Sequence, residues 1–392
     1  MFEQAIASRI ARLHTESAFQ ILAHANELES KGMSVIHCEI GQPDFTTPAN
    51  IIEAGCAALR SGYTGYTPTA GYPEVRQTIA EYIRAHKNVP AEKENIVIVP
   101  GGKPIMFFAM QLLVEPGDEV IYPNPGFPIY ESCIRFAGGK PIPMPLYAKN
   151  DFRPDWDSFE QSITDRTKLV IINSPSNPTG GVFSEEDIRK LAEILERHPD
   201  IYILSDEIYD RLIFEGHAFS IASLPGFQDR TIILDGFSKT YAMTGWRIGY
   251  GVMNPEFAEK IELLMVNSNS CTAAFTQIAA KEALTGPQDS VEEMREAFRK
   301  RSEYVTEALN GIDGITCRKP MGAFYTFPDI SSFGIPDKEF CMRLLDEYGV
   351  ATSWGTAFGS YGEGFMRLSC ATSMENLEMA VERIAEFTKT LK

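Results

Sequence analysis

The chain has 392 residues, 44% of them hydrophobic and 23% charged, as is typical of a globular protein that needs no disulfide or metal to support its core. Its net charge of −17 argues against a nucleic-acid partner, although a few local cations could still bind a small anion. The seven cysteines form no Cys-x-x-Cys pair, and no signal peptide or membrane-length apolar run is evident. We therefore expect reduced thiols, a cytoplasmic location, no metal site and no membrane partner.

The first part of the chain is expected to be an arm with one helix and one strand. Residues 1–32 are typical of a polar arm that continues into an amphipathic helix. A short strand over 35–40 leads into the turn-rich loop 41–45, and helices are predicted over 48–61 and from residue 73 to about 84.

From residue 95 onwards, short apolar runs alternate with helical stretches. The runs cover 95–99, 119–122, 169–172, 201–204, 231–234 and 247–252. Continuously apolar strands that alternate with helices predict a parallel sheet buried on both faces. Because ligands of such sheets bind beyond the carboxyl ends of the strands, the polar residues after each run are the candidate site.

The pattern changes at about residue 291. A long charged helix to about 309 is followed by short strands around 322–327 and 364–368 and by a final helix over 374–391. This pattern predicts a smaller α+β domain that also takes in the N-terminal segment. The predicted boundaries are 1–45 for the arm and its share of the small domain, 46–290 for a large cofactor-binding domain, and 291–392 for the small domain.

Three successive strand ends carry polar groups of complementary chemistry: Asn177, then Asp206 with Tyr209, then Lys239 with Arg247. A lysine can form an imine with a carbonyl compound, and an arginine can hold a phosphate. A carboxylate that faces a ring nitrogen keeps it protonated and makes the ring an electron sink. If the strands are neighbours, the set fits a phosphorylated pyridine aldehyde.

Further groups could complete such a site. Ser238 and the backbone N–H groups of 101–103, at a helix start, could help to hold the phosphate, and Phe127 could stack on the ring. Each residue also has a structural interpretation, as a helix cap, a turn, a loop or a core residue. The functional interpretation is favoured because each strand end supplies a different part that the ligand requires.

The stretch 238–250, Ser-Lys-Thr-Tyr-Ala-Met-Thr-Gly-Trp-Arg-Ile-Gly-Tyr, resembles the lysine motif of class I/II aminotransferases, which use pyridoxal 5'-phosphate. Asn-Pro-Thr-Gly at 177–180, Ser-Asp-Glu-Ile-Tyr at 205–209, and the motifs at 41–45 and 66–71 are similar to further family motifs in the same order. With the alternation above, the resemblance implies an α/β fold. A large domain would hold a mostly parallel seven-stranded sheet between helices, and the N- and C-terminal segments would form a smaller α+β domain.

The resemblance also implies the catalytic residues. Lys239 would be the Schiff-base lysine and then the base that moves the proton. Asp206 would pair with the pyridine nitrogen, and Tyr209 and Asn177 would bond the ring oxygen. An amino acid and a 2-oxo acid would react in turn, by a ping-pong mechanism.

The remaining implied roles concern binding. Arg367 would clamp the substrate α-carboxylate, assisted by Asn177 and the backbone at Gly41. Tyr66 would reach the phosphate across the interface of a homodimer. The other residues implied at the cofactor are Gly102, Lys103, Phe127, Ser238 and Arg247.

Two positions depart from the family pattern, and one bears on the substrate. Many members have serine where this chain has Gly236, and Trp or Tyr where it has Phe127. Phe19 aligns with a polar contact to acidic substrates in some relatives, so we expect a neutral or aromatic amino donor.

Several alternatives were weighed against this interpretation. An aspartate-type aminotransferase and a lyase or synthase on the same fold remain open. A regulator that senses the cofactor would be preceded by a DNA-binding domain, and a nicotinamide dehydrogenase would show a Gly-x-Gly-x-x-Gly motif after its first strand.

Overall fold

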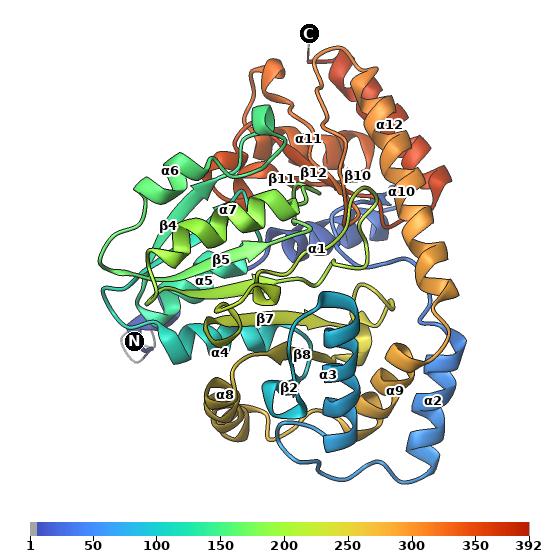
Figure 1. Cartoon of the computed structure of the whole chain (residues 1–392). Coiled ribbons are helices and arrows are strands. Elements are labelled where there is room, and N and C mark those ends of the chain that lie inside the picture. The colour runs from blue at the N-terminus through green and yellow to red at the C-terminus, as the bar shows by residue number, and fades with distance from the viewer. Residues whose placement is uncertain (1–5, 392) are drawn as a thin grey trace.

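The structure, a computed structural model, describes residues 6–391 and is built around a seven-stranded sheet (Figure 1). Strand β8 is antiparallel to both of its neighbours, and every other neighbouring pair is parallel. The predicted α/β fold with a mostly parallel sheet is therefore confirmed. In spatial order the strands are β2 (Ile96–Val99), β8 (Gly249–Val252), β7 (Thr231–Gly236), β6 (Tyr202–Asp206), β5 (Thr167–Asn173), β3 (Glu119–Asn124) and β4 (Lys140–Pro145).

The apolar runs predicted every strand of this sheet except β4. That strand carries Pro141, Pro143 and Pro145 at alternate positions, and proline cannot donate a hydrogen bond to a neighbouring strand. β4 pairs only with β3 and lies at the edge of the sheet, where one side of the strand needs no donors. The edge position thus explains why a sequence so poor in donors can still be a strand.

Helices cover both faces of the sheet because the side chains of each strand alternate between the two faces. In β2, Val97 and Val99 join one buried cluster, whereas Ile96 and Ile98 join another on the opposite face. The first face is covered by α4 (Lys103–Leu113), α5 (Ile129–Ala137) and α8 (Pro255–Ser268). The second is covered by α3 (Pro73–Lys87), α9 (Ala274–Thr285), α6 (Trp156–Gln161) and α7 (Glu185–Glu196), and α2 (Ala49–Arg60) packs beside α9.

A smaller α+β unit joins the two ends of the chain, as predicted. Ile36 and Cys38 from the N-terminal part pack against Phe340, Leu368 and Ile384 from the C-terminal part. The domain boundaries at 45/46 and 290/291 remain predictions. The elements of the unit are α1 (Ser17–Ser30), β1 (Ile36–His37), α10 (Asp289–Asn310), β9 (Tyr325–Thr326), α11 (Asp337–Tyr348), β10 (Val350–Ala351), β11 (Ser353–Trp354), β12 (Met366–Ser369) and α12 (Met374–Lys389).

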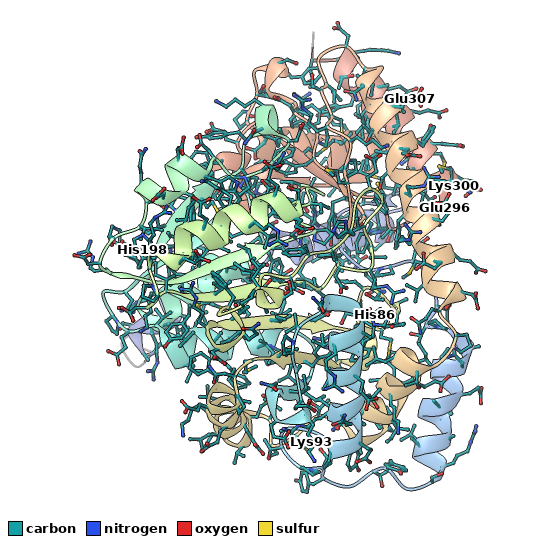
Figure 2. All side chains as sticks on the ribbon, viewed as in Figure 1. His86, Lys93, His198, Glu296, Lys300 and Glu307 are labelled. Atoms are coloured by element: carbon teal, nitrogen blue, oxygen red, sulfur yellow. The ribbon has the colours of Figure 1, made fainter. Side chains whose placement is uncertain are left out.

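Helix α10 runs along one side of the molecule and carries a charged outer face (Figure 2). Glu296 and Lys300 on this face form an ion pair of 3.6 Å. Within residues 6–391, no helix has the length and apolar character needed to cross a membrane. All seven cysteines are free thiols, and no group of three or more potential ligands in the described range is placed to hold a metal ion.

Candidate active site

A cavity of about 630 Å³ lies at the carboxyl ends of β5, β6 and β7, where the smaller α+β unit meets the large sheet. Of the predicted site residues, only Tyr66 is not part of its lining, and the Tyr66 side chain is 91% exposed, between α2 and α3. The predicted residues that line the cavity are Gly41, Gly102, Lys103, Phe127, Asn177, Asp206, Tyr209, Ser238, Lys239, Arg247 and Arg367.

The order of the strands explains why these residues meet. β5, β6 and β7 are parallel neighbours, so Asn173 at the end of β5 lies directly opposite Asp206 at the end of β6. Strand β8 is antiparallel to β7, with Gly249 opposite Gly236. The chain therefore leaves the sheet after β7, passes through Lys239 and returns through Arg247 at the same edge.

Lys239 extends into the cavity, where its Nζ donates a hydrogen bond to the Gly41 carbonyl at 2.5 Å. Burial lowers the pKa of the amine to about 8, with Glu16 acting in the opposite direction and Arg367, Lys103 and Arg247 adding to the lowering. A substantial fraction of the amine is thus neutral near physiological pH, as a nucleophile or base requires.

Asp206 is buried beside this lysine, and burial raises the pKa of its carboxyl group to about 6. The Tyr130 hydroxyl donates to its Oδ2 at 2.6 Å, and the Ile208 N–H donates to its Oδ1 at 3.3 Å; both bonds favour the ionised form. Sequence reasoning missed Tyr130, which lies in the first turn of α5 and carries no motif of its own.

A corner of the cavity is suited to an anion. Gly102 is the N-cap of α4, so no side chain caps the first N–H groups of this helix. These groups and the helix dipole give the start of α4 a partial positive charge. Gly101 has a φ of +83°, and a Cβ there would lie 2.1 Å from Nη2 of Arg247, so only glycine lets the guanidinium group pack on this backbone. Ser238 is buried at the same corner.

Gly236 supplies no side chain to this corner, and the structure gives the reason. A Cβ at Gly236 would lie 2.9 Å from the Cα of Gly249 on the neighbouring strand, closer than a real side chain allows. The Gly236 N–H instead donates to Oδ1 of Asp235 at 2.6 Å.

Arg367 lies on the opposite wall of the cavity, on β12, and its side chain is only 4% exposed. Its Nη1 donates to Oδ1 of Asn177 at 3.0 Å, and its Nη2 donates to the Glu39 carbonyl. The guanidinium group also lies 4.7 Å from the centre of the Tyr325 ring. Its Nε, by contrast, is buried without a hydrogen-bond partner. This fixed cation with an unused donor is suited to a carboxylate.

Tyr209 lies between the two walls, and its hydroxyl lies 2.9 Å from that of Tyr325. Sequence reasoning missed Tyr325, which follows an apolar stretch of the smaller unit. A Cβ at Gly41 would lie 2.1 Å from the Tyr325 hydroxyl oxygen, so the predicted Gly41 contact requires glycine for steric reasons. On the sheet side, the Phe127 ring packs edge-on against Tyr130, with ring centres 5.7 Å apart.

The N-terminal segment closes the outer end of the cavity. Phe19, which the sequence suggested for substrate selection, lines the cavity but is 59% exposed. Sequence reasoning missed Glu16, three residues earlier, whose carboxylate forms an ion pair with Nζ of Lys103. No local motif marked Glu16, because its contact depends on how the arm packs.

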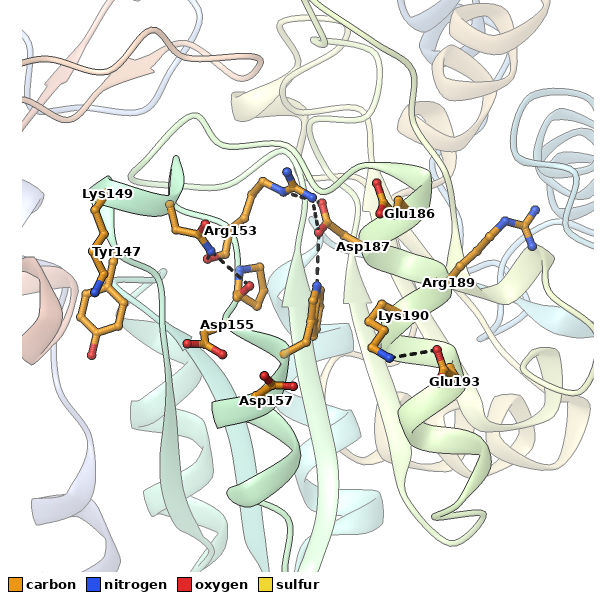
Figure 3. Close-up of a pocket in the computed structure, with 13 residues that line it drawn as sticks. Tyr147, Lys149, Arg153, Asp155, Asp157, Glu186, Asp187, Arg189, Lys190 and Glu193 are labelled. Carbon is orange, nitrogen blue, oxygen red and sulfur yellow. Dashed lines mark hydrogen bonds and ion pairs between the residues drawn. The ribbon is translucent and has the colours of Figure 1, made fainter.

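A second hollow of about 860 Å³ lies on the outer surface between residues 147–157 and α7 (Figure 3). Its charged groups pair with one another: Asp187 accepts from Nη2 of Arg153 at 2.7 Å and from Nε1 of Trp156 at 3.2 Å. The central charges of this hollow already have partners, so the cavity at the strand ends is the better candidate.

Comparison with known proteins agrees with this geometry. Residues 34–384 match the family described as aminotransferase class I and II. The chain is 38% identical over 393 residues to the aspartate aminotransferase of Rhizobium meliloti (strain 1021), covering 97% of this chain and 95% of that protein. The chain therefore belongs to the class I and II aminotransferase family, and the protein is an enzyme that transfers amino groups.

Solved structures give the same result. The aspartate aminotransferase from Rhizobium meliloti has a TM-score of 0.94 at 37% identity and covers 98% of each chain. The aromatic aminotransferase from Pyrococcus horikoshii OT3 has a TM-score of 0.89 at 37% identity, covering 93% of this chain and 99% of that one.

Proposed function

We propose that this aminotransferase uses pyridoxal phosphate to move an amino group from an L-amino acid to a 2-oxo acid by a ping-pong mechanism. The observation that carries the proposal is that one cavity, at two adjacent strand ends, contains both Lys239 and the buried Asp206. The pKa of Lys239 is lowered to about 8 there. When bound, the cofactor supplies the carbonyl carbon that carries the amino group and the ring that accepts the electron pair released at the substrate α carbon.

The residues present fit this cofactor. The backbone of Gly102 and Lys103 at the start of α4, together with Ser238 and Arg247, would hold the phosphate, since these groups provide backbone donors, a hydroxyl and a cation at one corner. Asp206 would hold the proton of the ring nitrogen, and Tyr130 would keep its carboxylate oriented. Phe127 would stack on the ring.

The substrate would be held from the opposite wall. Arg367 would bind the α-carboxylate, with Asn177 fixing the guanidinium plane. Lys239 would take the proton from the substrate α carbon and return it to the cofactor carbon on the other side of the amino nitrogen, because its partly neutral amine lies in the same cavity. Tyr209 and Asn177 would bond the ring oxygen of the cofactor.

We further propose that the enzyme works as a homodimer in the cytoplasm. The strongly exposed Tyr66 would reach the phosphate of the opposite subunit, and seven free thiols suit a reducing compartment. The relatives are named for aspartate or aromatic substrates. For this chain we propose a neutral or aromatic donor, with aspartate as the alternative.

A single-turnover experiment tests the reaction. Protein loaded with pyridoxal phosphate and mixed with an amino acid alone should release about one equivalent of the 2-oxo acid per subunit and then stop until a second 2-oxo acid is added. Lys239→Ala should still bind the cofactor but release none, whereas the exposed Lys260→Ala should behave as wild type. Continuous release of ammonia, or near-normal turnover by Lys239→Ala, would contradict the proposal.

A further inference from the structure

Glu16 occupies the N-cap position of α1 but does not act as a cap. Its side chain makes no capping hydrogen bond to the helix. Its carboxylate instead turns into the cavity and pairs with Nζ of Lys103, where the Glu16 side chain is 18% exposed and that of Lys103 is 50% exposed. The start of α1 therefore places a negative charge at the outer end of the catalytic cavity.

The charges that line the cavity show what this carboxylate does. The six charged side chains among the lining residues are Glu16, Lys103, Asp206, Lys239, Arg247 and Arg367. In the proposed function, Arg247 holds the phosphate, Arg367 holds the α-carboxylate, and Asp206 and Lys239 carry out the chemistry. The side chain of Lys103 is thus the remaining cation of this lining, and Glu16 neutralises it.

We propose that Glu16 excludes a second carboxylate from the side-chain end of the substrate site, so that the enzyme selects amino acids and 2-oxo acids with uncharged side chains. The inference rests on the proposed function, since it takes Arg367 as the anchor of the α-carboxylate. A dicarboxylic substrate would bring its distal carboxylate to Glu16 in a partly desolvated cavity, where like charges repel strongly. It would also have to break the Glu16–Lys103 pair to gain a cation.

The other groups around Glu16 suit an uncharged side chain. Ala18, Phe19 and Phe127 line the same cavity, and Nζ of Lys103 lies 5.4 Å from the centre of the Phe127 ring. An apolar or aromatic side chain could therefore bind along these surfaces while the ion pair stays intact. Because both substrates of a ping-pong reaction use one cavity, the same selection applies to the amino donor and to the 2-oxo acid.

The test compares kcat/KM for aspartate and phenylalanine as donors in wild type, Glu16→Gln and Glu16→Ser. Wild type should favour phenylalanine. Both variants should raise the aspartate-to-phenylalanine ratio by about ten-fold or more, because Lys103 becomes free to bind the second carboxylate. Glu27→Gln is the matched control, since Glu27 lies on the exposed side of α1 and pairs with Lys31 at 2.6 Å. The aspartate-to-phenylalanine ratio of Glu27→Gln should equal that of wild type.

A binding measurement gives a second readout that does not depend on turnover. The dissociation constants of maleate, a dicarboxylate, and 3-phenylpropionate, a monocarboxylate, are measured by calorimetry on the cofactor-loaded proteins. Glu16→Gln should bind maleate about ten-fold more tightly relative to 3-phenylpropionate. In the double variant Glu16→Gln/Lys103→Met this gain should disappear, which would identify Lys103 as the released cation.

Two results would overturn the inference: a wild-type preference for aspartate, or unchanged substrate and inhibitor ratios in both Glu16 variants. Failure of the proposed function looks different, because wild type would then release no 2-oxo acid from any donor. The maleate comparison still decides the role of Glu16 in that case.

Discussion

Lys239 is held as a partly neutral amine, and this state has a kinetic consequence. Its pKa of about 8 makes the nucleophilic form abundant at a pH where an ordinary lysine is almost fully protonated. We expect the rate at which cofactor-free protein binds pyridoxal phosphate to rise with pH from about 7 to about 9 and then level off. Stopped-flow absorbance measures this rate, and a rate that does not change with pH would contradict the assignment.

The same lysine should reduce the stability of the cofactor-free protein. The unfolded chain, with the ordinary lysine pKa of 10.5, binds more protons than the folded chain between about pH 8 and 10.5. The destabilisation is therefore complete below about pH 8 and disappears as the pH rises to about 10.5. Lys239→Met should stabilise the cofactor-free protein by about 1 to 3 kcal/mol at pH 7, and by much less at pH 10. Thermal denaturation at both pH values checks this prediction. The control Lys260→Met changes an exposed residue and should alter the stability at neither pH.

Tyr130 should control the acid limit of cofactor binding through Asp206. Wild type should lose cofactor affinity as the pH falls through about 6, because the carboxyl of Asp206 becomes protonated and can no longer pair with a protonated ring nitrogen. Tyr130→Phe removes a bond that favours the ionised form, so this loss should begin at higher pH. The shift is measured by fluorescence titration of cofactor binding at pH values from about 5 to about 8, a range that includes the pKa of Asp206. Identical profiles would show that the bond has no such role.

At the scale of elements, α3 supports the ends of β6 and β7 through one buried cation. Nζ of Lys87, the last residue of α3, lies 2.8 Å from Glu207, 2.5 Å from Asp210 and 3.1 Å from Asp235, and all four side chains are at most 9% exposed. These carboxylates flank the two strand ends that carry Asp206 and Lys239. The helix thus holds the edge of the sheet that borders the cavity by charge as well as by apolar packing.

Lys87→Met should lower the free energy of unfolding by about 3 to 5 kcal/mol at about pH 8, because the variant leaves buried carboxylates without a cation. Burial raises the pKa of Asp235 to about 7, so the folded protein binds more protons than the unfolded chain between about pH 4 and 7. Lys87 favours the ionised form of Asp235, so the pKa of this carboxyl group should be higher still in the variant. The folded variant then binds more protons than folded wild type as the pH falls, and its deficit should be smaller at about pH 5.5 than at about pH 8. Urea denaturation at both pH values measures it, and the exposed Lys93→Met, labelled in Figure 2, is the control.

At the scale of the whole molecule, Tyr66 explains why a homodimer is expected. Tyr66 is 91% exposed and lies outside the cavity of its own subunit. We expect the protein to sediment as a dimer. Tyr66→Phe should remain dimeric and bind pyridoxal phosphate about ten-fold more weakly, since a bond to a charged group is lost. Tyr147→Phe, also exposed, should have no effect. A monomer with full cofactor affinity would contradict the prediction.

The sequence predicted those parts of the molecule that local patterns encode. Apolar runs marked six of the seven strands of the large sheet. The proline-rich β4 was missed because its edge position, not its composition, makes it a strand. Glu16, Tyr130 and Tyr325 were missed because their place in the cavity depends on packing between distant segments. Resemblance, rather than any local pattern, pointed to Arg367.

The contact between Gly236 and Gly249 limits how this enzyme can evolve. The two glycines are paired across β7 and β8: a Cβ at Gly236 would lie 2.9 Å from the Cα of Gly249, whereas a Cβ at Gly249 would lie 2.8 Å from the backbone nitrogen of Gly102. Introducing a serine hydroxyl at the proposed phosphate corner by mutating residue 236 alone would push the strands apart before any bond was gained. Because the obstructing atom belongs to the backbone, no substitution at Gly249 would make room, and a mutational path to that hydroxyl must first change the spacing of the strands. The start of α4 offers the proposed phosphate site backbone donors that need no such change.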